Sequence, residues 1–293
     1  MTATKTQSVP ASANSVAFEF VQFLAQELSS GKVELPSFPD IAIKVRKVLA
    51  DDNMNLGMVL RVVGSEPTLA ARLLQIANSA ALSNGTPVRD LRNAVQRMGL
   101  NMVRSASIAF AMTQMKKAQD LKGLEAPMAA LWQRCTAVAA MAHVVARRMT
   151  KVNPDTALLA GLLHGVGELY ILTRANRHPA LFADRPAYDA IVRDWHVSVA
   201  QALLENWEMG EDIVRAVSEF EDLERRHSGP ADLSDVLTVA HLLVSYQEYP
   251  ESIELNMQGV SARHRMSMDD ISYANLILET KDEIKELQQA LGA

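Results

Sequence analysis

The sequence predicts an all-α protein, a multi-helix bundle, and three observations carry this prediction. Apolar residues recur at helical spacing along most of the chain. Alternation with a period of two, which marks a half-buried strand, is not sustained. Prolines and glycines stand where the helical patterns begin and end. With 293 residues, of which 48% are hydrophobic and 22% charged, the chain can bury the core of one large domain or two modest ones.

Each predicted helix has its own start and stop signals. The segment 35–39 is extended, because each of its two prolines disfavours helix in the residue before it. Ser65 is predicted to cap a helix with Pro67 in its first turn. Asp90 caps a later helix, which Gly99 ends. We expect helices near residues 14–31, 39–49, 56–63, 66–77, 91–99, 101–117, 127–149, 154–165, 168–175, 186–207, 210–226, 232–247 and 268–291.

The net charge of −5 is unevenly distributed along the chain. Residues 1–150 have a balance of +7, whereas the remainder has a balance of −12. This polarity favours charged partners or head-to-tail self-association, unless the charges belong to ordinary solvated helix faces. The overall acidity, together with the lack of a basic stripe interleaved with aromatic residues, argues against a dedicated nucleic-acid binder.

The composition also predicts a cytoplasmic location. The chain has one cysteine, Cys135, so it cannot form an internal disulfide, and a reducing compartment is expected. The N-terminal residues lack the apolar core of a signal peptide. Charges interrupt the apolar runs well short of about 18 residues, which predicts no membrane span.

Several short motifs follow one another between residues 32 and 225, and together they resemble the HD-related output domain (HDOD) family of bacterial signalling modules. The motifs are Leu35-Pro36-x-x-Pro39, the segment from Ser65 to Ala80 with Glu66-Pro67, Ala94-x-x-x-Met98-Gly99, Leu131-Trp132, Gly161-Leu162-Leu163-His164 and His196-x-x-x-Ala200-x-x-Leu203-Leu204-x-x-Trp207. The resemblance covers the HDOD domain with its N-terminal helical lobe (32–225). Outside it we expect an N-terminal tail and helix (1–31) and a C-terminal helical extension (226–293). The last helix of the extension either docks on the domain or forms a dimer seam.

The resemblance implies a fold similar to the HD phosphohydrolases, which include enzymes that hydrolyse cyclic di-GMP. In those enzymes, histidines and carboxylates hold two metals that activate water. This chain departs from that pattern, because Arg134 replaces a ligand histidine and Gly165 replaces the aspartate after His164. A guanidinium stays protonated and repels a metal. The positions that correspond to the enzymes' metal site are Arg134, His164, Gly165, His196, Glu219 and His241.

From these replacements we predict that the protein has no catalytic residue and binds no metal and no cofactor. A mononuclear site would require Glu219 or His241 to converge with His164 and His196. Without such convergence, the two histidines are interpreted as buried structural residues. Cys135, on an apolar helix, is interpreted as a core residue in preference to a redox sensor.

The arginines leave two interpretations open. Arg134 either binds a phosphate or nucleotide in place of the lost cation, or forms an ion pair with Glu168 or Glu219, which we favour because an unpaired buried guanidinium is costly. A second set either lines one surface that attracts a nucleotide or an acidic partner, or belongs to a solvated helix face. This set is Arg89, Arg92, Arg97 and Arg104.

The function implied by the resemblance is non-catalytic signalling through protein docking. The expected partners are signalling proteins, such as response regulators or cyclic di-GMP turnover enzymes, in the control of motility or virulence. Homodimerisation is compatible with the sequence, and no membrane partner is expected. One rival hypothesis is a residual metal-dependent phosphohydrolase that uses His164, His196 and Glu219. Another is a nucleotide receptor without turnover, which would use Arg134 or the arginines between 89 and 104.

Overall fold

The computed structural model describes residues 11–31, 33, 35, 39–79, 82, 85–115, 121–266 and 273–291. Over these residues the regular structure is helical and contains no strand, which confirms the all-α prediction. Two of the motif residues, Pro36 and Ala80, lie outside the described residues.

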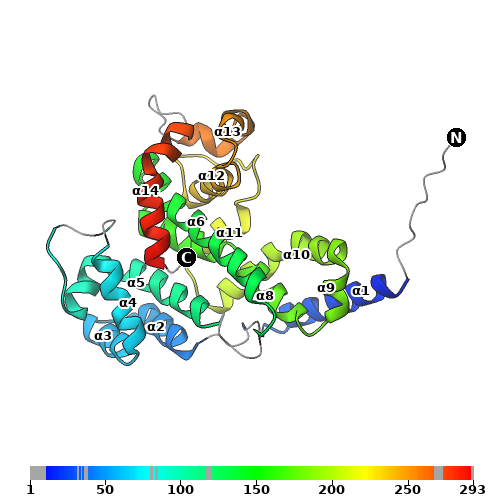
Figure 1. Cartoon of the computed structure of the whole chain (residues 1–293), viewed down its shortest axis with the longest axis horizontal. Helices are drawn as coiled ribbons and strands as arrows, with labels where there is room; N and C mark the ends of the chain where they lie inside the picture. Colours follow the sequence, from blue (N-terminus) through cyan, green and yellow to red (C-terminus); the bar gives the residue numbers. More distant parts are fainter. Residues whose placement is uncertain are drawn as a thin grey trace.

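The N-terminal lobe consists of α2 to α5, and α1 lies apart from it. Figure 1 shows α1 beside α9 and α10, at the opposite end of the molecule from α2, α3 and α4. Helix α5 packs against α7 and thereby joins the N-terminal lobe to the rest of the protein. The bounds are α1 Ala11–Ser29, α2 Asp40–Ala50, α3 Leu56–Gly64, α4 Pro67–Ala77 and α5 Leu91–Met115.

Two boundaries in this lobe differ from the sequence prediction. The side chain of Glu66, and not that of Ser65, caps α4 by accepting a hydrogen bond from the backbone N–H of Thr68 at 3.4 Å. Ser65 instead donates its hydroxyl to the carbonyl of Val62 at 2.7 Å, because it ends the preceding helix. Gly99, with φ of 74°, separates the two predicted helices as a kink inside α5.

The remaining helices form the HD-like lobe. Helices α6 and α7 pack extensively on each other, and α12 covers α6. Helices α9 and α13 were not predicted, and α11 stops at Glu219 instead of continuing to residue 226. The bounds are α6 Glu125–Met149, α7 Pro154–Leu163, α8 Val166–Ala175, α9 Pro179–Ala183, α10 Arg185–Asn206, α11 Glu211–Glu219, α12 Leu233–Ser245, α13 Pro250–Asn256 and α14 Tyr273–Leu291, with a 3₁₀ turn (η2) at Ser261–Arg265.

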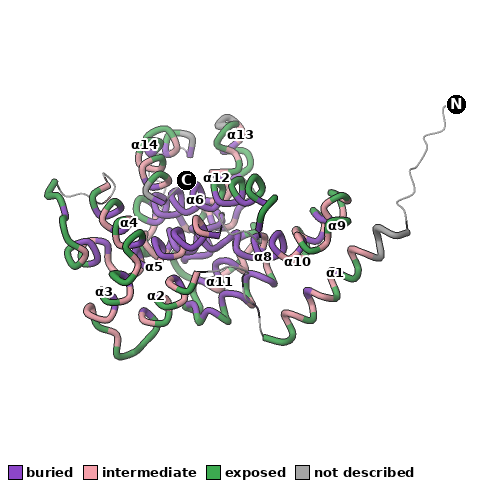
Figure 2. The backbone as a smooth tube through the Cα atoms, turned by 60° about the horizontal axis from the view of Figure 1, so that its bottom comes forward, coloured by how far each residue is buried: buried purple, intermediate pink, exposed green. Residues whose placement is uncertain are grey.

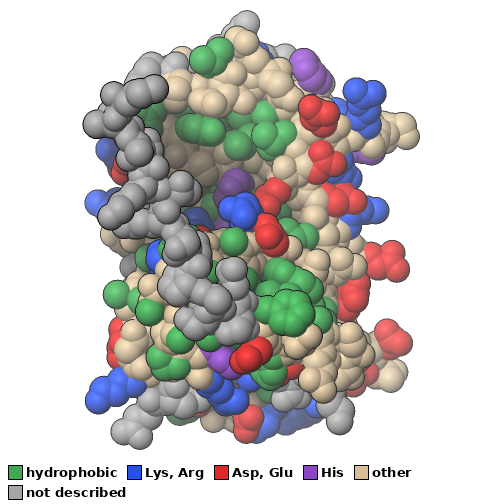
Figure 3. Space-filling view, turned by 90° about the vertical axis from the view of Figure 1, so that its right-hand side faces the viewer, with side chains coloured by type: hydrophobic (Ala, Val, Ile, Leu, Met, Phe, Trp, Pro, Cys, Tyr) green, Lys and Arg blue, Asp and Glu red, His purple; other side chains and the backbone are tan. Residues whose placement is uncertain are grey.

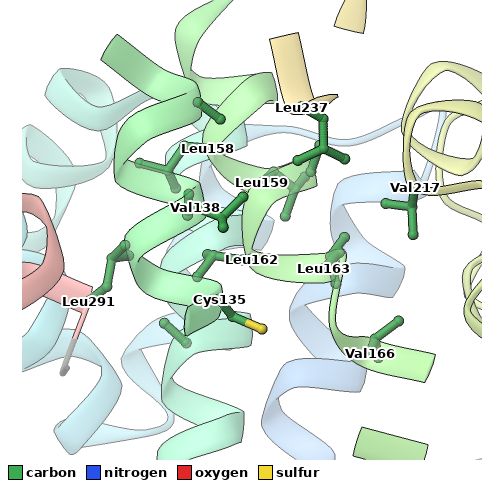
Figure 4. Close-up of a cluster of buried hydrophobic side chains, with 14 of the residues drawn as sticks. Cys135, Val138, Leu158, Leu159, Leu162, Leu163, Val166, Val217, Leu237 and Leu291 are labelled. Carbon is green, nitrogen blue, oxygen red and sulfur yellow. The ribbon is translucent and has the colours of Figure 1, made fainter. Parts of the chain in front are cut away.

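The C-terminal segment belongs to the same core as the rest of the protein. Figure 4 shows Leu237 of α12 and Leu291 of α14 in one buried cluster with Val138 of α6 and Leu162 of α7. Helix α14 lies along α6, where Glu283 and Glu279 pair with Arg147 and Arg148 at 2.5 and 3.2 Å. Of the two roles left open for this helix, the structure therefore provides docking on the domain.

Buried residues gather around α6 at the middle of the molecule (Figure 2). In α7, every residue from Ala157 to Leu163 is buried. The continuous stretch Pro154–Ala175, which includes α7 and α8, is long and apolar enough to cross a membrane by length and composition. Within the protein, 89% of its most apolar window is buried, as in a core helix.

Two glycines allow backbones to approach at the centre of this core. A Cβ atom added to Gly161 would lie 2.4 Å from the Cα of Ala139 on α6. A Cβ atom added to Gly167 would lie 1.9 Å from the carbonyl oxygen of His196 on α10. Real Cβ atoms do not approach backbone this closely, so only glycine permits the packing of α7 on α6 and of α8 on α10.

We predict that Gly167→Ala destabilises the protein by about 3 kcal/mol, at the upper end of the range for overpacked cores, because α8 must move away from α10. Urea denaturation measures the change. Gly64→Ala is the matched control, since its added Cβ would meet Leu91 at an ordinary 3.7 Å. A Gly167→Ala protein as stable as the control would contradict the close approach.

Candidate functional site

A pocket of about 410 Å³ opens on the HD-like lobe. Figure 3 shows this face, with a hollow in which a histidine lies near mixed basic and acidic side chains. The side chains come from α6, α8, α10, α12 and the segments that follow α7 and α11. The lining residues are Arg134, His164, Gly165, Glu168, Asp189, Val192, Arg193, His196, Phe220, Glu221, His241 and Ser245.

His164 lies in the wall of this pocket, directly after the last residue of α7. Its side chain is buried, and its Nδ1 lies 2.6 Å from the carbonyl oxygen of Gly161. Burial and, second, the neighbouring His241 lower the pKa of His164 to about 3, so the ring is neutral near pH 7. Because a carbonyl only accepts hydrogen bonds, Nδ1 carries the proton. Nε2 is then an acceptor, and it is buried without a hydrogen-bond partner among the described residues.

Phe220 and His241 form an aromatic cluster with His164. The ring centroid of His164 lies 5.6 Å from that of Phe220 and 5.7 Å from that of His241, and all three contacts are edge-to-face. Burial lowers the pKa of His241 as well. Its Nδ1 is also buried without a hydrogen-bond partner among the described residues.

His196, on α10, pairs with Glu221. Its Nδ1 lies 2.9 Å from the carbonyl oxygen of Val192 and its Nε2 lies 3.2 Å from the Glu221 carboxylate. Burial opposes protonation, but the hydrogen bond and charge of Glu221, with the backbone contacts, raise the pKa of His196. Both ring nitrogens are therefore engaged, and His196 has no lone pair free for a metal.

Arg134, on α6, forms an ion pair with Glu168, on α8. Of the two interpretations left open for Arg134, the structure provides the ion pair. The side chain of Arg134 is 43% exposed, so the pair lies at the mouth of the pocket. It places a fixed positive charge near His164 and His241, where it further lowers their pKa values.

Gly165 has no room for the carboxylate that the enzymes carry after the histidine. A Cβ atom added there would lie 2.5 Å from Sγ of Cys135 and 3.0 Å from Cδ1 of Leu131. Cys135 is buried, and burial raises the pKa of its thiol to about 12. The thiol is therefore a protonated core group, as interpreted from the sequence, and it is not a reactive thiolate.

The prediction that Glu219 belongs to this site is wrong. Its carboxylate accepts hydrogen bonds from Arg225 at 2.6 Å and Ser234 at 3.2 Å, and it does not line the pocket. Because α11 ends at Glu219, the following turn directs Phe220 and Glu221 to the pocket instead. Sequence reasoning missed Glu221. Phe220 follows Ala216, a buried residue of α11, by four positions, so both lie on the same helix face. This spacing would have predicted that Phe220 is buried and that Glu221 lies next to it.

The residues of this pocket do not fit a metal centre. In the described part of the chain, one group of three side chains brings possible metal-ligand atoms within 4.8 Å of one another. This group is His227, Asp232 and Asp235, and it lies outside the pocket. Even there, Arg265 binds Asp235 at 2.6 and 2.8 Å and Arg225 binds Asp232 at 2.6 Å. Two guanidinium groups thus hold the carboxylates that a cation would need.

The four arginines between 89 and 104 do not form one free basic surface. Arg97 donates to the carbonyl oxygens of Ala77 and Thr86 at 3.2 and 2.7 Å. Arg104 is partly buried and donates to a carbonyl oxygen of α2, at 3.3 Å. Only Arg89 and Arg92 are exposed. None of the four lines the pocket.

We predict that His164→Gln flattens the pH dependence of stability in acid. The histidine titrates near 6.5 when unfolded and near 3 when folded, so in this window the unfolded state binds one proton more and stability falls as pH decreases. The contribution reaches about 1.4 kcal/mol per pH unit. Unfolding free energies from about pH 7.5 to about pH 4.5 measure it. His264→Gln, on the surface, is the control. Equal slopes in wild type and His164→Gln would contradict a buried neutral imidazole.

We also predict that Gly165→Ala destabilises the protein by about 1–3 kcal/mol, because the new methyl group meets the Cys135 sulfur. Replacing the sulfur in the double variant Gly165→Ala/Cys135→Ala should recover part of that loss. A double-mutant cycle by urea denaturation measures the coupling, which we expect to exceed about 0.5 kcal/mol. Additive effects would show that Cys135 does not fill the space of the lost carboxylate.

Comparisons with known proteins agree with this architecture. A Shewanella amazonensis structure, whose name proposes a metal-dependent phosphohydrolase, has a TM-score of 0.74 and 23% identity, covering 94% of this chain and 99% of its own. A Geobacter sulfurreducens HDOD domain protein of unknown function has a TM-score of 0.63 and 23% identity, covering 94% and 98%. A Marinobacter aquaeolei structure, whose name proposes signal transduction, has a TM-score of 0.57 and 18% identity, covering 98% and 68%. Identities this low show a shared fold alone.

An uncharacterised protein of Treponema pallidum is 21% identical over 254 residues, and the match covers 78% of this chain but about half of that relative, 47% of its length. The family model described as the HDOD domain matches residues 35–223, which is more than half of the chain. The resemblance found in the motifs is thereby confirmed: the chain belongs to the HDOD family.

Proposed function

We propose that this protein is a non-catalytic member of its family, which docks other signalling proteins and does not hydrolyse a phosphodiester. A signalling role follows from membership of the HDOD family. The absence of hydrolysis rests on the pocket. In the pocket, Arg134 occupies the position of a ligand histidine of the enzymes and forms an ion pair with Glu168. Gly165 occupies the position of their carboxylate and packs against Cys135.

The chemistry of the pocket supports this proposal. A dinuclear centre needs several imidazole and carboxylate ligands directed at two cations, which lower the pKa of bound water. Here the Nε2 of His196 is bound to Glu221, and the guanidinium of Arg134 supplies a permanent positive charge beside the two neutral imidazoles. Placing a divalent cation in this pocket would separate existing pairs and bring like charges together.

The proposed partners are cytoplasmic signalling proteins, such as response regulators or enzymes of cyclic di-GMP turnover, in circuits that control motility or virulence. The balance of −12 over residues 151–293 favours partners that present a basic face, because complementary charge accelerates encounter. The N-terminal lobe and the HD-like lobe are joined through α5 and α7, so a partner meets one continuous body.

Metal analysis and turnover on the purified full chain test this function together. We expect manganese, iron and zinc far below one per chain, and no hydrolysis of cyclic di-GMP or bis(p-nitrophenyl) phosphate when each metal is added. His164→Gln and His196→Gln are the reference proteins for background. Stoichiometric metal with hydrolysis that both substitutions abolish would establish the rival phosphohydrolase instead.

A further inference from the structure

The pocket contains acceptor and donor capacity that the protein itself leaves unused. The Nδ1–H of His164 is fixed by Gly161, so the distal ring nitrogen, Nε2, presents a lone pair at the pocket wall. This atom and Nδ1 of His241 are buried without a hydrogen-bond partner among the described residues. Leaving a buried polar atom unpaired costs about 1–3 kcal/mol, which a suitable ligand group would recover.

The charged groups of the same wall, in contrast, already have opposite partners. Arg134 pairs with Glu168, and His196 pairs with Glu221. Arg193 pairs with Asp194 at 3.1 Å and Asp189 with Arg185 at 3.0 Å. A phosphate group would compete with these carboxylates for the same cations and would lie close to their negative charge. A neutral ligand would not, so the balance of charge favours an uncharged molecule.

The shape and the walls of the pocket favour a small planar ring system. Its volume of about 410 Å³ falls in the range of small-molecule sites. The rings of Phe220, His164 and His241 lie together in its wall and offer edges and faces against which a heteroaromatic ring packs.

We propose that this pocket binds an uncharged nitrogen heterocycle of the nucleobase or nucleoside class, whose N–H group donates a hydrogen bond to Nε2 of His164. The inference rests on the proposed function, since a pocket that held metals would present these nitrogens to cations. The neutral rings of His164 and His241 recognise the ligand, and the arginines keep their carboxylate partners.

Binding at this place would connect four elements of the HD-like lobe. The ligand would contact His164 after α7, Phe220 after α11 and His241 on α12, close to His196 on α10. Occupancy stabilises the arrangement that forms the contacts, in proportion to ligand concentration over its dissociation constant. The pocket would thereby couple the level of a small metabolite to the packing of these helices.

Isothermal titration calorimetry of the full chain with the common ribonucleosides tests the proposal, with guanosine and its 5′-monophosphate as a pair that differs in charge. We expect saturable binding of at least one nucleoside, and its monophosphate to bind no more tightly. His164→Phe keeps a ring and removes the acceptor, and should weaken binding about tenfold, the worth of one hydrogen bond to a buried acceptor. His264→Phe is the same substitution on the surface and should leave affinity unchanged.

The ¹⁵N resonance of His164 Nε2 provides a second measurement that needs no variant, and we expect it to shift on titration with the bound nucleoside. Lack of binding by all nucleosides at millimolar concentration, an unchanged resonance, or much tighter binding of the monophosphate would overturn the proposal. Metal content and phosphodiester hydrolysis are measured on the same preparation. If metal and hydrolysis are absent and nucleosides do not bind, this inference is wrong and the proposed function stands. If metal is present together with hydrolysis, the proposed function itself is wrong.

Discussion

The close approach of helix backbones at Gly161 and Gly167 is the constraint on which the rest of the structure depends. A side chain at either position would collide with the backbone of a neighbouring helix, at Ala139 or at His196. The two contacts fix α7 on α6 and α8 on α10. Because His164 lies between the glycines and His196 is itself the backbone contact of Gly167, the same packing brings both histidines to one pocket. The scaffold of the site is thus set by main-chain contacts.

The charged and packed groups around the pocket support one another physically. Arg134 would be costly near a buried imidazole, but Glu168 neutralises it across the mouth of the pocket. The space beside Gly165 is filled by the Cys135 thiol, so a carboxylate would need the cysteine to change as well. The site is therefore a packed and charge-compensated structure. Its interior contains one buried ring nitrogen of His164 and one of His241 that have no hydrogen-bond partner among the described residues.

The C-terminal segment completes this interior, although the family match ends at residue 223. Helix α12 contributes His241 to the pocket and Leu237 to the core. Its N-terminus is held by Asp235, a buried carboxylate that binds Arg265 and His227 and so ties η2 and the segment after α11 to the helix. Arg225 binds Asp232 at the start of α12 and also Glu219, which directly precedes Phe220 and Glu221. Residues 226–293 therefore act as a wall of the site as much as a covering for the domain.

The sequence by itself determined the helical class, most helix positions and the family, because hydrophobic period, caps and short motifs are local properties. It also indicated an ion pair for Arg134, although the expected reason, burial, does not hold, because the side chain is 43% exposed. Only the tertiary structure decided that this partner is Glu168, that Glu221 and not Glu219 faces the pocket, and that α14 docks on α6. Each of these depends on where a helix ends or which helices meet, and such outcomes follow from packing between segments that are distant in the chain.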